Sequence, residues 1–573
     1  MDDAPPPGAS SHNAAPIEDE DLLISVSGGL GHMDEERNVY VKDQDCTECL
    51  KDLQRFLRRD DVFERPVFHR LGQWDLVSTD LVPLIVHHQD DADVVYNALK
   101  VLTFLTMPIE PQSDLLSEQC KHLKRIKQCF LANDALAVIV GLLAGPLSRY
   151  PRLPERDILV TQLVLTFVRN IMCIDSAEHT LGIDGGPSAD YDLAQGKADL
   201  LQRLFRDNVL EIVLLVAQHA NEKTFKNDAP LILHILHQVF EGFDAAQLFG
   251  RADGIPSARG RGEAIPKAKG IASNAGGGRA RTTAAGAVAK SELALALSSE
   301  RRARITGTSF TRLPPRHRQF SGTFVKKYAD VSQQYVFTQR SMKPGIDRDD
   351  MMGGGGGGRR GRRAFAFDGA RIPMPGALQP LLCGFVDGLL DGGYDVLMDT
   401  IRPELMHGIG ISRYDKEDYM RFFKLSRFCT SYVKLKVEKE KEKEKEKEKE
   451  KERDAMGEKG NKGPASPFSS IGATLGWDMF HLLLTVWSQQ IELPTRADDK
   501  DWALQGASLA LLKEMLGLLH VAYERGSRLD RQAADKLSRR LLHDDLKQSG
   551  LFPLLCKMMK QYVKRKKKKE KKR

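Results

Sequence analysis

The stretch from Ser78 to Pro108, STDLVPLIVHHQDDADVVYNALKVLTFLTMP, most constrains what this chain can fold into. Its first half can be capped by Ser78 or Thr79 and places apolar residues at helical spacing: Leu81, Leu84 and Ile85. The polar corner Gln89-Asp90-Asp91 then offers N-cap oxygens to a second helix. That helix ends at Pro108 and repeats apolar residues every three or four positions: Val94, Val95, Ala98, Val101, Leu102 and Leu105.

Two helices joined in this way cannot bury their apolar sides alone. Stacked copies of the pair share one continuous core, which is the architecture of an α-solenoid. Helical patterns with short polar corners continue from Glu48 to about Phe240, and no useful length of strand-like alternation interrupts them. The sequence therefore predicts an all-α fold, an armadillo/HEAT-like helical-repeat solenoid with a long disordered basic loop and a charged linker.

Shifts in composition divide the chain into segments. From Arg251 to about Ser309 large apolar residues are scarce, so this stretch cannot offset its ordering entropy. The strict Glu–Lys alternation from Glu438 to Glu452 puts like charges at i,i+4, which predicts a solvated linker. The expected segments are a disordered N-terminus (1–20), an N-terminal solenoid (21–250), a disordered basic loop (251–308), a partly ordered basic and aromatic segment (309–345), a Gly/Arg-rich flexible segment (346–375), a continuation of the solenoid (376–437), an EK-rich linker (438–470), a C-terminal helical block (471–562) and a basic tail (563–573).

Two other helix starts carry local signals. Asp45-x-x-Glu48 has the spacing of a capping box, in which each side chain bonds a backbone N–H at the other end of the first turn. Asn208-x-x-Glu211 has the same spacing and opens the apolar run NVLEIVLLVAQHA. We expect helices to begin at both places.

The N-terminus, the apolar runs and the cysteines indicate the cellular compartment of the protein. The acidic, Pro-rich start MDDAPPPGAS cannot serve as the basic region of a signal peptide. The longest uncharged apolar run, Ala135–Pro146, is too short to cross a bilayer. We therefore expect a soluble, intracellular protein without membrane contact. Its scattered cysteines are typical of reduced thiols in cytosol or nucleus: residues 46, 49, 120, 129, 173, 383, 429 and 556.

The net charge of +7 hides a segregation of charge along the chain. Residues 251–380 carry a net charge of +15 and the last ten residues, KRKKKKEKKR, carry +8, which leaves −16 for the rest. An acidic helical body with basic appendages is typical of a protein that touches a polyanion through loops and tails while its body contacts other proteins. In the alternative interpretation, the basic segments are disordered and serve only to keep the protein soluble.

Several stretches, in a fixed order, resemble the N-terminal part of the Timeless family, the replication-fork proteins partnered by Tipin. The block STDLVPLIVHHQDDADVVYNALKVLTFLTMPIEP is the most recognisable, and RHRQFSGTF stands where the family typically has Arg-His-Ser-Arg-Phe-Gly-Gly. Family members run considerably longer, so the resemblance implies that this chain is truncated or a partial gene model. Further matching stretches are LLISVSGGLG, YVKDQDCTECLKDLQRFLRRDD, LTFVRNIMCI, DNVLEIVLLVAQHANEKTF, LILHILHQVF, FVDGLLDGGYDVLMDTIRPEL, YDKEDYMRFFKLSRFCTSY, HLLLTVWSQQIELP and LLKEMLGLLHVAYERGSRLD.

The resemblance implies a non-enzymatic scaffold of a Timeless–Tipin fork protection complex in the nucleus. Such a scaffold would hold replicative helicase and polymerase components together, grip duplex or fork DNA, and relay stalled-fork signals with a Claspin-like checkpoint mediator to the checkpoint kinases. The alternative is a protein-only interaction scaffold of the same fold, such as a clock-type regulator or a transport adaptor, which would not bind DNA.

Two basic stretches are the candidate contacts with nucleic acid. One could neutralise phosphates or could be a loop pinned on an acidic groove of the body by intramolecular pairs: Arg312, Arg316, His317, Arg318, Lys326 and Lys327. The other lies in the tail and fits a nuclear localisation signal, a DNA-binding tail or a solvated terminus: Lys564, Arg565, Lys566, Lys567, Lys568 and Lys569.

No motif predicts catalysis, a cofactor or a metal. Cys46 and Cys49 form a lone pair without the further ligands that zinc requires, so they are expected to be ordinary thiols. His87 and His88 end a helix, where the negative end of the dipole favours them. The run Gly353–Gly358 lacks the Lys-Ser/Thr of a phosphate-binding loop, and no strand precedes it.

Overall fold

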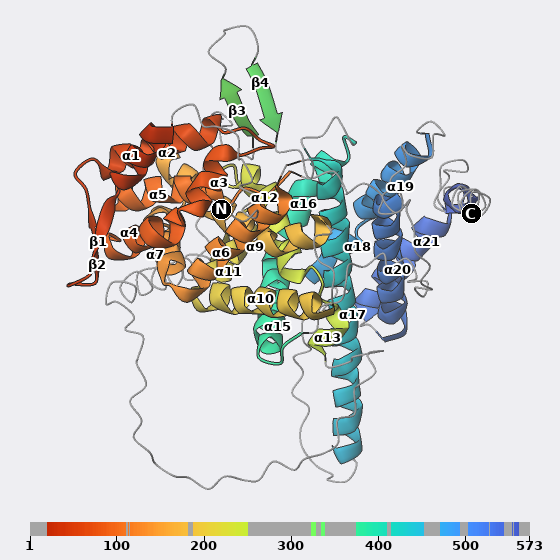
Figure 1. Cartoon of the computed structure of the whole chain (residues 1–573). Helices are drawn as coiled ribbons and strands as arrows, with labels where there is room; N and C mark the ends of the chain where they lie inside the picture. The colour runs from red at the N-terminus through yellow and green to blue at the C-terminus, as the bar shows by residue number, and fades with distance from the viewer. Residues whose placement is uncertain are drawn as a thin grey trace, which may run out of the picture.

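The computed structural model is dominated by α-helices, which stack from an N-terminal end to a C-terminal end (Figure 1). This confirms the all-α fold class. The armadillo/HEAT type of repeat and the segment boundaries stay predictions. The structure describes residues 20–110, 113, 115–181, 187–249, 323–327, 334–338, 374–408, 414–451, 470–492, 502–525, 528–543, 553 and 555–560.

The N-terminal part of the body contains a short hairpin and most of the helices. The hairpin strands are β1 (Gly31–Asp34) and β2 (Val39–Lys42). The helices are α1 (Glu20–Gly28), α2 (Cys46–Arg59), α3 (Pro66–Gln73), the π-helical turn η1 (Val77–Leu81), α4 (Val82–His87), α5 (Ala92–Leu105), α6 (Leu116–Ala132), α7 (Ala135–Gly141), α8 (Ala144–Arg149), α9 (Glu155–Leu181), α10 (Pro187–Arg206), α11 (Val209–Gln218), the 3-10 turn η2 (Lys226–Asp228), α12 (Ala229–Phe240) and α13 (Ala245–Leu248).

The C-terminal part adds longer helices and a second hairpin. The strands β3 (Thr323–Lys327) and β4 (Gln334–Thr338) pair antiparallel, with Thr323 opposite Thr338. The two hairpins are the strands that the helical pattern did not predict. The helices are α15 (Leu378–Gly388), the π-helical turn η3 (Leu389–Gly393), α16 (Tyr394–Leu405), α17 (Lys416–Lys451), α18 (Gly472–Leu475), α19 (Trp477–Glu492), α20 (Trp502–Arg525) and α21 (Arg528–His543).

The helix pair predicted from Ser78–Pro108 is present as α4 and α5. The Asp91 side chain accepts a hydrogen bond from the Val94 backbone N–H and caps α5, as expected of the polar corner. The expected cap of the first helix is wrong, because Ser78 lies inside the turn η1 and its hydroxyl donates to Asp75 over 2.5 Å. The apolar residues predicted to face the core are all buried: Leu81, Leu84, Ile85, Val94, Val95, Ala98, Val101, Leu102 and Leu105.

A row of helices runs through the body, each packed on the next in the order α2, α5, α9, α12, α17 and α20. The other helices flank this row; α6 contacts α9, and α16 contacts α11 and α12. Figure 1 shows the row spanning the body from α2 near one end to α20 near the other. Each inner helix of the row thus buries two sides against its neighbours, and the core is continuous along the row.

The helices on either side of the segment 250–373 belong to one body. The Gln379 side chain on α15 donates a hydrogen bond of 2.8 Å to the Leu248 carbonyl at the end of α13. Phe385 on α15 also makes edge-to-face contact with Phe205 on α10, with ring centroids 5.8 Å apart. The helices before and after this segment therefore pack into one continuous core.

The EK-rich segment was expected to be a linker, but its first part is helical. Helix α17 continues to Lys451 and projects beyond the body (Figure 1). Its first half is anchored by buried residues such as Phe422 and Phe423. Extending an existing helix costs far less than nucleating one, and Glu and Lys are good helix formers. Opposite charges at i,i+3 add weak support, which the like charges at i,i+4 do not outweigh here. The rest of that segment lies outside the described residues.

The two predicted capping boxes are wrong in detail, although helices begin where they were expected. Asp45 has a near-helical backbone and Asn208 a left-handed one (φ 58°), and neither side chain makes a cap hydrogen bond. The capping box that the structure does contain begins α13, between Asp244 and Gln247. Spacing alone does not set the backbone angle that lets a side chain reach the first turn.

Helix α9 contains a stretch that is long and apolar enough to cross a membrane, Glu155–Ile174. The protein buries 78% of its apolar window, so the stretch serves as a core helix of this body. The bent pair Leu116–Ala132 and Ala135–Arg149, which includes the apolar run seen in the sequence, passes the same test of length and composition.

Candidate nucleic-acid interface

Most of the basic residues singled out in the sequence lie outside the described residues. This is so for Arg312, Arg316, His317 and Arg318, and for the tail residues Lys564, Arg565, Lys566, Lys567, Lys568 and Lys569. Lys326 and Lys327 belong to β3, where they stand opposite Tyr335 and Gln334 of β4. Their roles stay predictions.

The paired histidines and cysteines near the N-terminus have structural partners. His87 Nδ1 accepts a hydrogen bond of 3.0 Å from the Tyr40 backbone N–H, and His88 Nε2 lies 2.9 Å from the Tyr40 carbonyl oxygen. Cys46 is buried and unbridged, and burial raises its pKa to about 11, which disfavours the thiolate that a metal would need. Among the described residues no group of His, Cys, Asp and Glu side chains could hold a metal ion.

The described body has a cluster of basic side chains of its own, which spans three consecutive helices of the central row. Lys51 and Arg58 lie two turns apart on α2, Lys100 lies on α5, and Arg156 lies in the first turn of α9. We call Lys51, Arg58, Lys100 and Arg156 the basic cluster.

Buried contacts between the helices hold the basic cluster in place. Gln54 of α2 donates a hydrogen bond of 3.2 Å from Nε2 to the Asn97 carbonyl oxygen of α5, and both residues are buried. The Lys100 ammonium lies 4.1 Å from the centre of the Tyr96 ring, in a cation–π contact. Arg156 pairs with Asp93 and so links the start of α9 to the start of α5.

Two of the four cations in the cluster have no carboxylate partner in the described part of the chain. Lys51 forms an ion pair of 2.5 Å with Glu48, and Arg156 pairs with Asp93, whereas within the described residues neither Arg58 nor Lys100 forms an ion pair. Burial lowers the pKa of Lys100, and the neighbouring charges of Arg58, Lys51 and Arg156 lower it further. Like charges held together in this way favour the approach of an anion.

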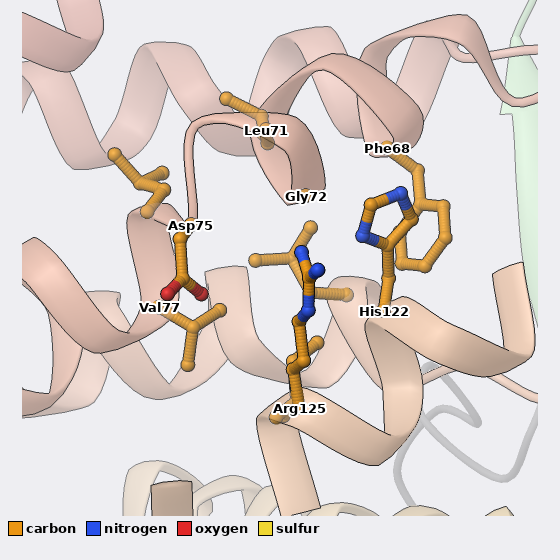
Figure 2. Close-up of a pocket in the computed structure, with 10 residues that line it drawn as sticks. Phe68, Leu71, Gly72, Asp75, Val77, His122 and Arg125 are labelled. Atoms are coloured by element: carbon orange, nitrogen blue, oxygen red, sulfur yellow. The ribbon is translucent and has the colours of Figure 1, made fainter. Parts of the chain in front are cut away.

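A small pocket lies between α3, η1 and α6, and Figure 2 shows its lining. Its lining is mostly apolar, and the polar side chains in the lining are Asp75, His122 and Arg125. The Asp75 carboxylate is engaged by the Ser78 hydroxyl, and the His122 ring packs edge-on against Phe68. Burial lowers the pKa of His122, so its imidazole is neutral at pH 7. Asp75 and His122 are therefore used in turn formation and packing.

One thiol lies against an imidazole inside the row of helices. Cys173 Sγ of α9 and His234 Nε2 of α12 are 3.4 Å apart. Burial raises the pKa of Cys173 to about 11 and holds the pKa of His234 well below its usual value. The pair therefore stays a neutral thiol and a neutral imidazole, which is the opposite of an activated nucleophile.

The comparison with protein families gives a match over the region that contains this cluster. The family described as "Timeless protein" matches residues 39–326, which is half of the chain. The chain belongs to the Timeless family. The matched region of this Timeless-family chain includes the hairpin strand β2, all four residues of the basic cluster, and β3 up to Lys326.

The relatives of this Timeless-family chain come from animals and fungi. It is 25% identical over 243 residues to the human protein timeless homolog, 28% over 249 residues to topoisomerase 1-associated factor 1 of Coccidioides immitis, and 23% over 249 residues to mating-type switching protein swi1 of Schizosaccharomyces pombe. Each alignment covers 40% of this chain and 19%, 20% and 24% of these relatives, respectively. The aligned part thus spans at most about a quarter of their length.

The basic cluster of this Timeless-family chain was not predicted from its sequence. Its members are separated by up to 105 positions between Lys51 and Arg156, and no local pattern connects them. The seven-residue spacing of Lys51 and Arg58 was the one available signal, because it puts both on one side of α2. Their nearness to Lys100 and Arg156 follows only from the packing of α2, α5 and α9.

Proposed function

We propose that this Timeless-family chain is a non-enzymatic scaffold of a replication fork protection complex in the nucleus. In this role it pairs with Tipin, associates with duplex or fork DNA, and contacts replicative helicase and polymerase components together with a Claspin-like checkpoint mediator. It thereby supports fork stability and checkpoint signalling. Family membership supports the fork role, and the row of stacked helices supports scaffolding, because such stacks bind partners through extended surfaces.

The basic cluster is the observation that carries DNA association. A DNA duplex presents one negative charge for about every 1.7 Å of its length, and Lys and Arg that neutralise phosphates release counterions. Arg58 and Lys100 are two cations held together by helix packing with no described carboxylate to neutralise them. A phosphate backbone supplies the missing negative charge, and the basic loop and tail add to the same attraction.

A protein-only scaffold is the second candidate, and one observation favours it. Glu48 and Asp93 neutralise two of the four cations of the cluster, and their side chains are 64% and 70% exposed. An extended DNA backbone would approach these carboxylates as well as the cations. A clock-type regulator or transport adaptor of this fold would therefore show no DNA affinity at physiological salt.

Binding of a short, fluorescently labelled DNA duplex to the whole chain, followed by anisotropy at increasing KCl, tests DNA association. The double variant Arg58→Ala/Lys100→Ala removes the two unpaired cations. The matched control Arg528→Ala/Lys536→Ala removes one exposed Arg and one exposed Lys from α21 and changes the net charge equally.

We expect the logarithm of the binding constant to fall linearly with the logarithm of the salt concentration for the unmodified chain. The slope should become shallower by roughly 1 for each phosphate contact removed, hence by about 2 in the cluster variant. The control should keep its slope. A flat salt response of the unmodified chain, or equal losses in both variants, would contradict DNA binding through the cluster.

A further inference from the structure

Helix α20 carries large apolar side chains on the side that faces away from the body as well as on the side that faces it. The inward side is buried (Leu504, Leu511, Leu512, Met515, Leu518 and Leu519). On the outward side Leu509, Leu516 and Tyr523 are 36%, 43% and 59% exposed. A surface helix ordinarily keeps its outward side polar, whereas a helix that is apolar all round is covered on both sides.

The three exposed residues are spaced seven positions apart, at 509, 516 and 523. Seven residues make nearly two turns, so the side chains lie one above another in a line about 21 Å long. We call Leu509, Leu516 and Tyr523 the α20 stripe. A seven-residue apolar repeat is the pattern by which one α-helix packs along another, and neither a strand nor a small molecule requires it.

Within the described residues α20 packs on α17 and α21, and α19 and α17 contact it through polar side chains. Trp487 of α19 donates a hydrogen bond of 2.8 Å to the Ser508 hydroxyl, and Lys434 of α17 forms an ion pair of 3.3 Å with Glu514. A Cβ atom added at Gly517 would lie 3.2 Å from the Lys434 ammonium. These contacts fix the rotation of α20 on α17, and the three side chains of the stripe stay exposed with α17, α19 and α21 in place.

Charge beside the stripe favours an acidic partner. Lys513 lies between Leu509 and Leu516, is exposed, and forms no ion pair with a described residue. His520, one turn before Glu524, is already paired with that carboxylate at 3.2 Å. The exposed cation in the middle of the stripe is therefore Lys513, and charges that flank an apolar seam between helices set the choice of partner.

We propose that the α20 stripe docks an amphipathic helix of the partner subunit, one with an apolar residue at every seventh position and a carboxylate that faces Lys513. This inference rests on the proposed pairing with Tipin and names the surface that performs it. The partner helix lies along α20 and covers Leu509, Leu516 and Tyr523.

Co-expression of the whole chain with Tipin from the same organism, followed by size-exclusion chromatography and titration by calorimetry, tests the proposal. Leu516→Glu puts a carboxylate in the middle of the stripe. Leu381→Glu is the matched control, because Leu381 on α15 is 42% exposed and lies outside the stripe. Lys513→Glu keeps the stripe intact and reverses the charge between Leu509 and Leu516.

We expect the unmodified chain and Leu381→Glu to co-elute with Tipin, Leu516→Glu to lose co-elution, and Lys513→Glu to bind at least tenfold more weakly. Co-elution of the unmodified chain together with undiminished binding by Leu516→Glu and Lys513→Glu would overturn the docking surface and leave the pairing intact. Absence of co-elution by the unmodified chain would overturn the pairing itself, and the docking surface with it.

Thermal melting of each variant without partner separates docking from folding. Leu516→Glu should melt at the temperature of the unmodified chain, since the stripe is open in the chain alone. A melting temperature lowered by Leu516→Glu and unchanged by Leu381→Glu would show that a segment of the same chain covers the stripe. That result would overturn the proposal of a partner helix.

Discussion

Tyr40 joins the N-terminal hairpin to the helical body through Asp80: its hydroxyl donates a hydrogen bond of 2.9 Å to Asp80 Oδ1. The Tyr40 ring is fully buried, and His87 and His88 at the end of α4 hold its backbone. Gly31, which pairs with Lys42 across the hairpin, leaves room for the Tyr40 ring: its φ is +141°, and an added Cβ would lie 2.9 Å from Tyr40 Cε1. A two-stranded hairpin is marginal alone, so its order depends on such contacts with the helical body.

Tyr40→Phe removes only the hydroxyl of that contact. A hydrogen bond to a charged group contributes about 1.5–3 kcal/mol when buried, and Asp80 is partly solvated, so we expect a loss of about 1 kcal/mol in the free energy of unfolding. Urea denaturation followed by circular dichroism measures the change. Tyr523→Phe is the control, because Tyr523 is exposed and lacks a described hydrogen bond; equal losses in the two variants would contradict the role of Tyr40.

His69 should make the protein less stable in acid. Burial, and then the neighbouring His122, lower the pKa of His69 to about 4; Arg65 acts in the same direction and Glu118 opposes it. An unfolded histidine has a pKa of about 6.5, so the unfolded state binds the proton more readily. The stabilisation is complete above pH 6.5 and declines as pH falls toward 4, by up to about 1.4 kcal/mol per pH unit.

Melting temperatures between pH 7.5 and 5 check this effect. His69→Phe should flatten the decline, although His122 and His237, whose pKa values are also lowered by burial, keep part of it. A decline in melting temperature that is as steep in His69→Phe as in the unmodified chain would show that His69 does not carry the acid sensitivity.

Asp93→Asn should strengthen DNA binding. The change frees Arg156 from its ion pair and removes a negative charge beside the basic cluster. Asp535→Asn is the control, because it removes a carboxylate that pairs with Arg539 on α21. Duplex anisotropy should show tighter binding and a salt slope steeper by roughly 1 for Asp93→Asn alone. Unchanged affinity would place the DNA away from α5 and α9.

The features predicted correctly from the sequence depend on interactions within one turn or one helix. The cap at Asp91 and the apolar side of α5 need only the residues of one turn and one helix. The extension of α17 to Lys451 was missed because it depends on an anchored first half, which a local charge pattern does not contain. The basic cluster was missed for a related reason, since Arg58 and Lys100 meet only when α2 packs on α5. The fold class could therefore be predicted from local patterns, whereas the candidate site depends on tertiary packing and could not.

Capture of newly synthesised DNA from cells of the source organism tests the role at the replication fork most directly. The chain would carry an epitope tag, and the nascent DNA would be labelled by a short pulse of a thymidine analogue, cross-linked and isolated. The account predicts that the tagged chain is enriched on pulse-labelled DNA and lost after a chase with unlabelled thymidine, as the fork moves away. Equal recovery before and after the chase, or no recovery above that of bulk nuclear protein, would contradict it.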